Sequence, residues 1–232
     1  MDLALFDTYN LRARFSVAVL YALPFIVDAV LLVDISNILP VTVFTLALVA
    51  LSQAAMGPIR DIGKKKDIKI NRAADLLAPE SDLPLLTKRR YYRKLSASEP
   101  EFAPFATLLD KPDQLSKEEI SALCHTVIRW LRGKTRDSKT FKMLKEENIN
   151  YGFRRNLYAL RMPGIFFNLA ALLVLLYQEG FFTNLCLRLI MVPQIFLHLV
   201  MLLYLWRIVT EDFVNVASER YANALLDTID LL

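Results

Sequence analysis

FSVAVLYALPFIVDAVLLV, residues 15–33, sets the class of the fold. About 20 apolar residues are enough for a helix to cross the hydrocarbon core of a bilayer, and this stretch is interrupted only by Pro24 and Asp28. It is too long for the apolar region of a signal peptide, and no small-x-small cleavage site follows it. The stretch therefore predicts a retained transmembrane helix.

Three further segments have the same character. They are ILPVTVFTLALVALSQAAM (38–56), a run over 162–178, and FFTNLCLRLIMVPQIFLHLVMLLYLW (181–206). Short polar breaks at 34–37 and 179–180 join the four segments in pairs. We therefore predict an all-α membrane protein with four transmembrane helices, arranged as two hairpins on either side of a middle domain.

Lysine and arginine near the ends of the spans predict the orientation, because cytoplasmic loops carry an excess of both. The two hairpin turns contain neither residue, whereas Arg12 and Arg14 precede the first span and Arg207 follows the last. The loop between the hairpins is rich in cations. We expect both termini and the middle domain to be cytoplasmic.

Charge divides the chain of 232 residues into segments of different character. Residues 58–161 hold 23 Lys and Arg against 14 Asp and Glu, a net charge of +9, and the rest of the chain has a net charge of −5. This excess predicts an anionic partner for the middle domain: lipid headgroups, a nucleotide or nucleic acid. The predicted domains are 1–57, 58–161, 162–206 and 207–232.

The middle domain has the pattern of helices. Ser116 and Glu119 form the sequence of a capping box at the start of a helix with apolar residues at helical spacing. A second helix is predicted over 84–96, and a third after Ser138, running towards residue 162. Cys124 and Cys186 lie in different contexts, which predicts neither a disulfide framework nor a thiolate metal site.

KRRYYRK, residues 88–94, places five cations around two tyrosines. In a helix, Arg89, Tyr92 and Arg93 share one face. Cations that track phosphate and rings that stack on bases are typical of single-stranded nucleic-acid sites. The alternative is a solvated cationic helix beside the membrane.

ENINYGFRRN, residues 147–156, again combines rings with paired arginines. Asn148, Tyr151 and Arg155 fall on one helical face with Arg154 beside them. Asparagine can pair with an adenine edge and arginine can bind phosphate. Gly152 costs about 1 kcal/mol relative to alanine inside a helix, which suggests a bend or the close approach of a backbone or ligand. Ordinary chemistry at a helix terminus is the alternative.

Four short blocks resemble the membrane effectors of the Hailong anti-phage defence systems. These blocks are YNLRAR (9–14), RDIGKK (60–65), WLRGKTRDSKTF (130–141) and EENINYGFRRN (146–156). The resemblance implies a partner nucleotidyltransferase that makes single-stranded oligodeoxyadenylate. It also implies that this DNA binds the cytoplasmic domain and holds a multi-subunit channel closed, so that loss of the DNA depolarises the bacterial inner membrane.

On this hypothesis the chain is a homo-oligomeric channel, with a tetramer favoured, and it is not an enzyme and needs no cofactor. Four spans form too thin a bundle for a wide pore in one chain, so subunits would surround an axis. The expected DNA-binding residues are Lys88, Arg89, Arg90, Tyr92, Arg93, Lys134, Arg136, Asn148, Tyr151, Arg154, Arg155 and Asn156.

Polar residues within the spans are costly and usually face a bundle interior or a water-filled path. A polar seam that only packs helices together is the alternative to a pore lining. Pro163 and Gly164 lie where the helix that carries Asn156 would enter the third span, and we expect a hinge there. The pore or seam candidates are Asp28, Asn168, Arg188, Gln194 and His198.

The tail over 207–232 has apolar residues at every fourth position from Phe213 to Ile229 and predicts an amphipathic helix. Its acidic residues favour packing on the basic domain or pairing of subunits over binding to anionic lipid. No phosphate-binding glycine loop, His-Glu-x-x-His or Cys/His cluster is present in the sequence. Two other hypotheses stay open: a membrane-embedded enzyme that processes lipid or nucleotide, and a membrane anchor for a nucleic-acid-binding partner.

Overall fold

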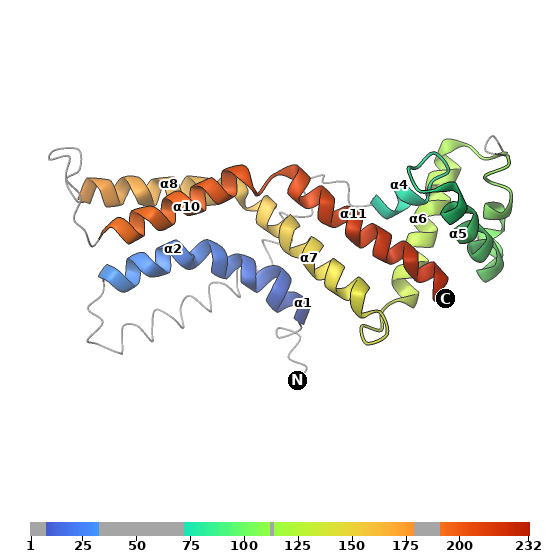
Figure 1. Cartoon of the computed structure of the whole chain (residues 1–232), viewed down its shortest axis with the longest axis horizontal. Coiled ribbons are helices and arrows are strands. Elements are labelled where there is room, and N and C mark those ends of the chain that lie inside the picture. Colours follow the sequence, from blue (N-terminus) through green and yellow to red (C-terminus); the bar gives the residue numbers. More distant parts are fainter. Residues whose placement is uncertain (1–7, 33–71, 112–113, 179–190) are drawn as a thin grey trace. The chain divides into compact units, whose positions relative to one another are not determined.

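The computed structural model describes residues 8–32, 72–111, 114–178 and 191–232, and every residue placement below concerns these ranges. Within them the chain is helical and has no strand, which confirms the predicted all-α class (Figure 1). The predicted second span at 38–56, both hairpin turns and Arg188 lie outside the described residues.

The described residues form a series of helices. In chain order they are α1 (Thr8–Asn10), η2 (Leu11–Phe15), α2 (Ser16–Leu32), α4 (Arg72–Leu77), α5 (Leu85–Ser98), η3 (Pro100–Ala106), α6 (Lys117–Lys134), α7 (Lys142–Ala159), α8 (Arg161–Gln178), α10 (Val192–Arg207), α11 (Glu211–Asp227) and η6 (Thr228–Asp230).

The chain divides into two compact units. Unit 1 comprises Met1–Ile68 and Ile149–Val214, and unit 2 comprises Lys69–Asn148 and Asn215–Leu232. The boundaries fall inside α7 and α11, so each of these helices begins in one unit and ends in the other.

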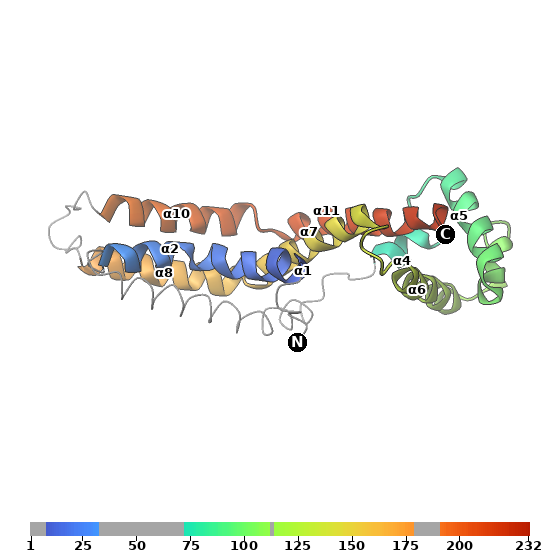
Figure 2. The same cartoon turned by 90° about the horizontal axis from the view of Figure 1, so that it is seen from below.

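Unit 1 contains a bundle of α2, α8 and α10, hereafter the bundle. Helix α8 packs along α10, and α10 also contacts α2; the two views of Figures 1 and 2 show these helices side by side. An apolar cluster fills one part of the bundle, made of Val17, Leu157, Met201, Leu205 and Val209.

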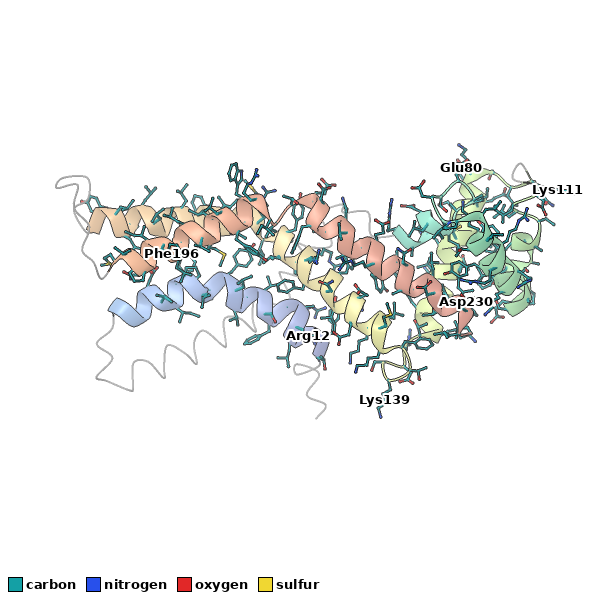
Figure 3. The ribbon with its side chains drawn as sticks, viewed as in Figure 1. Arg12, Glu80, Lys111, Lys139, Phe196 and Asp230 are labelled. Atoms are coloured by element: carbon teal, nitrogen blue, oxygen red, sulfur yellow. The ribbon has the colours of Figure 1, made fainter. Side chains whose placement is uncertain are left out.

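The bundle encloses polar side chains beside its apolar cluster and carries large apolar side chains on its outside. Asn168 and His198 are fully buried and Gln194 is 1% exposed, whereas Phe196 on α10, marked in Figure 3, is 65% exposed. Interiors of water-soluble domains show the reverse arrangement. The other large exposed apolar residues of α8 and α10 include Phe166, Phe167, Leu173, Tyr177, Leu203 and Trp206.

Some of the described helices are long and apolar enough to cross a membrane. One helical stretch, Thr8–Asp28, meets the length and composition of a span, and up to three spans result if each bent helix pair counts as one. Helix α8 qualifies only together with α7, and α10 only together with α11.

Unit 2 has an apolar core between α4, α5, η3, α6 and the end of α11. The Tyr92 ring meets Phe105 edge-on, with 4.7 Å between the centroids, and Phe102 meets Trp130 in the same way at 5.5 Å. Such aromatic pairs add about 0.5–1.5 kcal/mol to the effect of burial alone. Pro100 starts and Pro104 interrupts a short 3₁₀-helix over Pro100–Ala106.

Helix α6 begins as the sequence predicts. The Ser116 hydroxyl accepts from the Glu119 backbone N–H at 3.2 Å, and the Glu119 carboxylate accepts from the Ser116 N–H at 2.8 Å. These bonds lower the pKa of Glu119, the backbone bond contributing most. The next helix does not begin at Ser138: Asp137 accepts from Lys139 N and Thr140 Oγ1 in a turn, and α7 begins at Lys142.

The predicted packing of the tail on the middle domain is confirmed. Ala222, Leu225, Leu226 and Ile229 are buried in the core of unit 2. Earlier in the same helix, Phe213 packs against the apolar cluster of unit 1.

Candidate functional site

Three of the five predicted seam residues meet inside the bundle. Nε2 of His198 lies 2.8 Å from Oδ2 of Asp28 on α2, and its Nδ1 lies 2.9 Å from Oδ1 of Asn168 on α8. Asn168 Nδ2 donates to the carbonyl of Gly164 at 2.9 Å. One side chain from each helix of the bundle therefore joins a single hydrogen-bonded chain, hereafter the polar seam.

Gln194 extends the polar seam by one helical turn along α10. Its two amide atoms and Oδ1 of Asp28 are buried and have no hydrogen-bond partner. Leaving such a group without a partner costs about 1–3 kcal/mol, so buried polar atoms of this kind call for an explanation such as a water or an ion.

The surroundings of the imidazole limit its chemistry. Phe25 meets the His198 ring edge-on, with 5.4 Å between the centroids. Both ring nitrogens of His198 are engaged by Asp28 and Asn168, which leaves neither nitrogen to take a proton from a substrate. This arrangement suits proton storage or helix packing better than general-base catalysis.

The KRRYYRK segment lies on α5, and two of its members are structural. Lys88 is 6% exposed, and its ammonium donates to the carbonyls of Pro79 and Ser81 at 2.7 and 2.6 Å. The Tyr92 hydroxyl donates to the carbonyl of Leu77 at 2.6 Å, and burial raises the pKa of this phenol above its usual range. Both side chains stabilise the fold of unit 2, and the Tyr92 ring is not open to stacking on a base.

Three other members of the segment bind the end of the chain. Tyr91 donates to Asp227 at 2.7 Å, and burial, with Asp227, raises the pKa of the phenol to about 12. Arg90 forms an ion pair with Asp230 at 2.9 Å, and Lys94 pairs with the same carboxylate at 3.4 Å. The tail therefore neutralises part of this cationic surface.

Arg89 and Arg93 are exposed, as Arg90 is, and they line one side of a hollow of about 430 Å³. Neither has an ion-pair partner among the described residues. Phe105, Leu109 and Asp110 contribute to the other walls. The face shared by Arg89, Tyr92 and Arg93 thus exists as predicted, but it presents guanidinium groups around a buried ring.

The second strip, 147–156, lies on α7. Its side chains Arg154, Arg155 and Asn156 make contacts within unit 1. Arg154 donates to the carbonyl of Phe213 at 3.0 Å, and its guanidinium lies 4.5 Å from the centroid of that ring. Asn156 is fully buried and donates to the carbonyl of Ala13 at 2.7 Å. Arg155 lies over the Tyr151 ring, 5.5 Å from its centroid.

The glycine in this strip is explained by close packing. A Cβ added at Gly152 would collide with the Tyr9 hydroxyl and would lie 3.2 Å from the Cβ of Ala13. Of the explanations that the sequence allowed, the structure shows the close approach of another segment, here the first helical turns of the chain.

The expected hinge region contains a bend. Helices α7 and α8 meet at Leu160 with an angle of 53°, three residues before Pro163. Gly164 is closely packed, since a Cβ there would collide with Tyr21 and would lie 2.9 Å from Leu205 Cδ1. The bend therefore lies at the single residue between α7 and α8. Gly164 instead allows the close contact of α8 with α2 and α10.

The remaining predicted contacts lie in unit 2. Asn148 is half-buried on α7; Arg136 is exposed, and Lys134 is exposed with its ammonium 5.6 Å from the Trp130 ring centroid. The sequence analysis missed Arg129 and Arg132, which are exposed with His125 on one face of α6. Their spacing of four and three residues was the signal.

The net charge of unit 2 is lower than that of the predicted middle domain. Unit 2 holds 17 Lys and Arg against 15 Asp and Glu, a net charge of +2, because the acidic tail belongs to it and 58–68 and 149–161 do not. Any preference of unit 2 for anions therefore depends on local groups of cations, such as Arg89 with Arg93.

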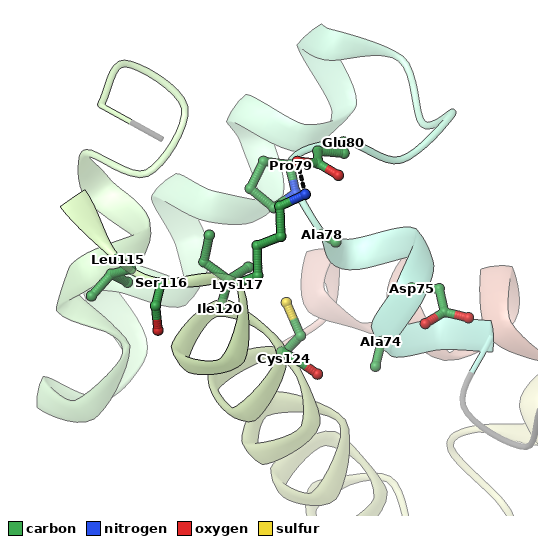
Figure 4. A pocket seen from close by; sticks show the side chains of 11 residues that line it. Ala74, Asp75, Ala78, Pro79, Glu80, Leu115, Ser116, Lys117, Ile120 and Cys124 are labelled. Atoms are coloured by element: carbon green, nitrogen blue, oxygen red, sulfur yellow. Dashed lines mark ion pairs between the residues drawn. The ribbon is translucent and has the colours of Figure 1, made fainter. Parts of the chain in front are cut away.

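A second hollow, also of about 430 Å³, lies between α4 and α6 (Figure 4). Lys117 and Glu80 face each other at 3.8 Å at its rim, and both are largely exposed, so this ion pair is weak. Cys124 lies in its wall, and burial raises the pKa of the thiol to about 12. The thiol is therefore protonated at neutral pH and unreactive.

The search for similar proteins gave no result: no family model, no characterised protein and no solved structure matches this chain. No group of three or more His, Cys, Asp or Glu that could hold a metal ion occurs in the parts of the chain that the structure describes. The candidate sites are therefore the polar seam of the bundle and the hollow beside Arg89 and Arg93.

Proposed function

We propose that the chain is a membrane effector: a homo-oligomeric ion channel whose conductance is controlled by a short single-stranded DNA at its cytoplasmic domain. The observation that carries the proposal is the reversed polarity of the bundle, which has an apolar outer face and encloses Asp28, Asn168 and His198. Ionisable groups within membrane spans usually mark ion pathways or relays.

The bilayer accounts for the outer face of the bundle. In water, the exposed apolar side chains of α8 and α10 would be unfavourable, and exposed apolar patches mark sites of contact with protein or membrane. Trp206 and Arg207 end α10, and Arg161 begins α8 and donates to the Trp206 carbonyl at 3.0 Å. Aromatic and basic residues concentrate where spans meet the cytoplasmic surface.

The DNA ligand has separate support. Arg89 and Arg93 are exposed, unpaired among the described residues and placed around a hollow. Guanidinium groups in this arrangement suit phosphate. The resemblance to the Hailong effectors supplies the identity of the ligand as oligodeoxyadenylate, the nucleotidyltransferase that makes it, and the direction in which it acts, which is to hold the channel closed.

The alternative of a membrane-embedded enzyme has less support. Both nitrogens of His198 are engaged within the chain. A general base needs a free nitrogen within reach of its substrate.

Current recording tests the proposal directly. The full chain is reconstituted in planar bilayers, and oligodeoxyadenylate is added to the side of unit 2, with a duplex of equal length as the control. We expect currents that the single strand suppresses, with an affinity that falls steeply with salt because counterions are released. Absence of current without DNA would contradict the channel, and currents that ignore DNA would contradict its ligand.

Two matched variants test the ligand site. Arg89→Ala with Arg93→Ala removes two exposed charges at the hollow, and we expect binding to weaken by about 1.5–3 kcal/mol, the value of hydrogen bonds to charged groups. Arg129→Ala with Arg132→Ala removes two exposed charges on α6 and should have a smaller effect. Equal losses would indicate non-specific attraction. These variants are preferable to Arg154→Ala with Arg155→Ala, because Arg154 holds the Phe213 carbonyl.

A further inference from the structure

The hydrogen bonds of the polar seam assign a proton to His198. Asn168 Nδ2 donates to the carbonyl of Gly164 at 2.9 Å. A carbonyl can only accept, so the amide oxygen of Asn168 is the atom that faces Nδ1 of His198, at 2.9 Å. A ring nitrogen opposite an acceptor must carry a hydrogen. Asn168 therefore fixes the imidazole with its Nδ1 protonated.

The opposite ring nitrogen shares a hydrogen with Asp28. Nε2 of His198 and Oδ2 of Asp28 are 2.8 Å apart, a hydrogen-bond distance that requires one hydrogen between them. The pair is then either imidazolium with carboxylate or neutral imidazole with carboxylic acid. Both forms have the same heavy atoms and no net charge, which suits an interior of low polarity.

No other charged group lies beside this pair in the described residues. On α2 the acid is Asp28 itself, and the Tyr21 hydroxyl is bound to the Leu157 carbonyl. On α8 the nearest charged residue is Arg161, seven residues before Asn168, and on α10 it is Arg207, nine residues after His198. A proton added to the pair, or taken from it, would leave a buried charge that nothing compensates, which is strongly unfavourable.

The pair is open to polar partners on one side only. Gln194 lies one turn from His198, and both of its amide atoms are buried without a hydrogen-bond partner. Oδ1 of Asp28 is likewise buried without a partner. In the other direction along α10, Met201 and Leu205 belong to the apolar cluster of the bundle. A polar partner such as water is therefore called for on the side of Gln194, whereas the other side is apolar.

We propose that Asp28 and His198 form a proton-binding site that holds one shared proton, and that a change in this proton loosens α2 from α8 and α10. The site takes its proton from the side of Gln194. Its effect on conductance rests on the proposed channel function, whereas proton binding itself does not. The ligand of the bundle is thus hydronium, in addition to the DNA proposed for unit 2.

Nitrogen NMR of the full chain in nanodiscs tests the site without any channel assay. The chain has two histidines, and His125 is exposed and serves as the internal control. His198 should carry hydrogen on Nδ1 and show a shared hydrogen on Nε2. A bare Nδ1 on His198 would overturn the proposal.

Substitution of Asp28 tests the shared hydrogen. In Asp28→Asn the amide can donate to Nε2, so His198 should become a neutral ring with its hydrogen on Nδ1 and a bare Nε2. His125→Ala should leave the His198 signals unchanged. An Nε2 signal that does not move in Asp28→Asn would show that Asp28 does not share a proton with His198, and the proposal would fail.

Charge rescue and pH-dependent current complete the test. His198→Asn alone leaves the Asp28 carboxyl without its partner and should lower the melting temperature of the bundle, and adding Asp28→Asn should recover part of that loss. A double variant that melts no higher than His198→Asn would contradict the shared proton. In bilayers, acid on the Gln194 side should change the wild-type current, and the double variant should lose this pH dependence. A double variant with the wild-type pH dependence would contradict the site even where DNA control of the channel is intact.

Discussion

Unit 1 and unit 2 are both helical, yet they place histidine and phenylalanine side chains differently. His198 is fully buried in the bundle and His125 is exposed on α6. Conversely, Phe196 is 65% exposed in unit 1, while Phe102 is 2% exposed in unit 2. The two helical regions of this chain therefore differ in which side chains they expose.

The comparison shows what stabilises each unit. Water drives apolar side chains together in unit 2. Between helices in lipid this driving force is absent, and packing and hydrogen bonds hold them together. The polar seam and the close contacts at Gly164 are interactions of that second kind.

The largest expected effect comes from deleting buried leucines. Leu131 in unit 2 and Leu205 in the bundle are both fully buried. We expect Leu131→Ala to lower the unfolding free energy of unit 2 by about 2–5 kcal/mol. Leu205→Ala should lower the unfolding free energy of the bundle by less, because helices in lipid lose packing contacts but no hydrophobic driving force. Unfolding in detergent, with hydrogen exchange to locate each loss, measures both; equal losses would break the comparison.

A charge on an exposed site gives the next largest effect. Phe196→Arg places a cation on the outer face of the bundle and should cost about 2.5–3.5 kcal/mol at the centre of a span. Leu86, 79% exposed in unit 2, is the matched control, and Leu86→Arg should change stability by less than about 0.5 kcal/mol. Membrane insertion and melting in detergent measure both variants. If Phe196→Arg is as well tolerated as the control, the outer face of the bundle does not contact lipid.

Removing one tyrosine hydroxyl from each unit compares the strength of their hydrogen bonds. Tyr91→Phe removes a bond to Asp227 and should cost unit 2 about 1.5 kcal/mol, the lower end for bonds to charged groups. Tyr21→Phe in the bundle removes a bond to the Leu157 carbonyl, a neutral bond of about 0.5–1.5 kcal/mol. Limited proteolysis tests Tyr91→Phe, because this variant should make Asp227–Asp230 more accessible to the protease. A tail equally protected in Tyr91→Phe would show that apolar packing alone holds it.

The Tyr91 bond also predicts a pH dependence. The pKa of Tyr91 is raised from 10.0 to about 12 in the folded unit. Folding therefore favours the neutral phenol, so its contribution to stability is complete below pH 10 and is lost as the pH rises towards 12. Unfolding of the wild type and Tyr91→Phe between pH 9 and 12 should converge. A constant difference in stability between the two proteins over that range would show that the Tyr91 phenol does not cause the pH dependence.

The smallest expected effect is at the start of α6. Ser116→Ala removes the capping hydroxyl and should destabilise unit 2 by about 1 kcal/mol. Ser121, exposed in the same helix, is the matched control, where alanine should be neutral or slightly stabilising because of its helix propensity. A loss at Ser121 equal to that at Ser116 would mean that the cap contributes nothing specific.

Local patterns in the sequence predicted what depends on neighbours along the chain. The capping box at Ser116 and Glu119, the helix over Leu85–Ser98 and the amphipathic tail were all confirmed. These features follow from spacing within one helix, which a single sequence displays. The meeting of Asp28, Asn168 and His198 was less accessible, since the sequence showed only that each lies in an apolar run.

The KRRYYRK segment shows most clearly what the sequence determines by itself and what only the tertiary structure decides. Its seven residues determine by themselves a cationic helix with Arg89, Tyr92 and Arg93 on one face. Only the tertiary structure decided that Lys88 binds the carbonyls of Pro79 and Ser81 and that Tyr91 binds Asp227. The physical reason is that periodicity fixes which side chains share a face, whereas the partner of a face comes from residues as far as 136 positions away along the chain.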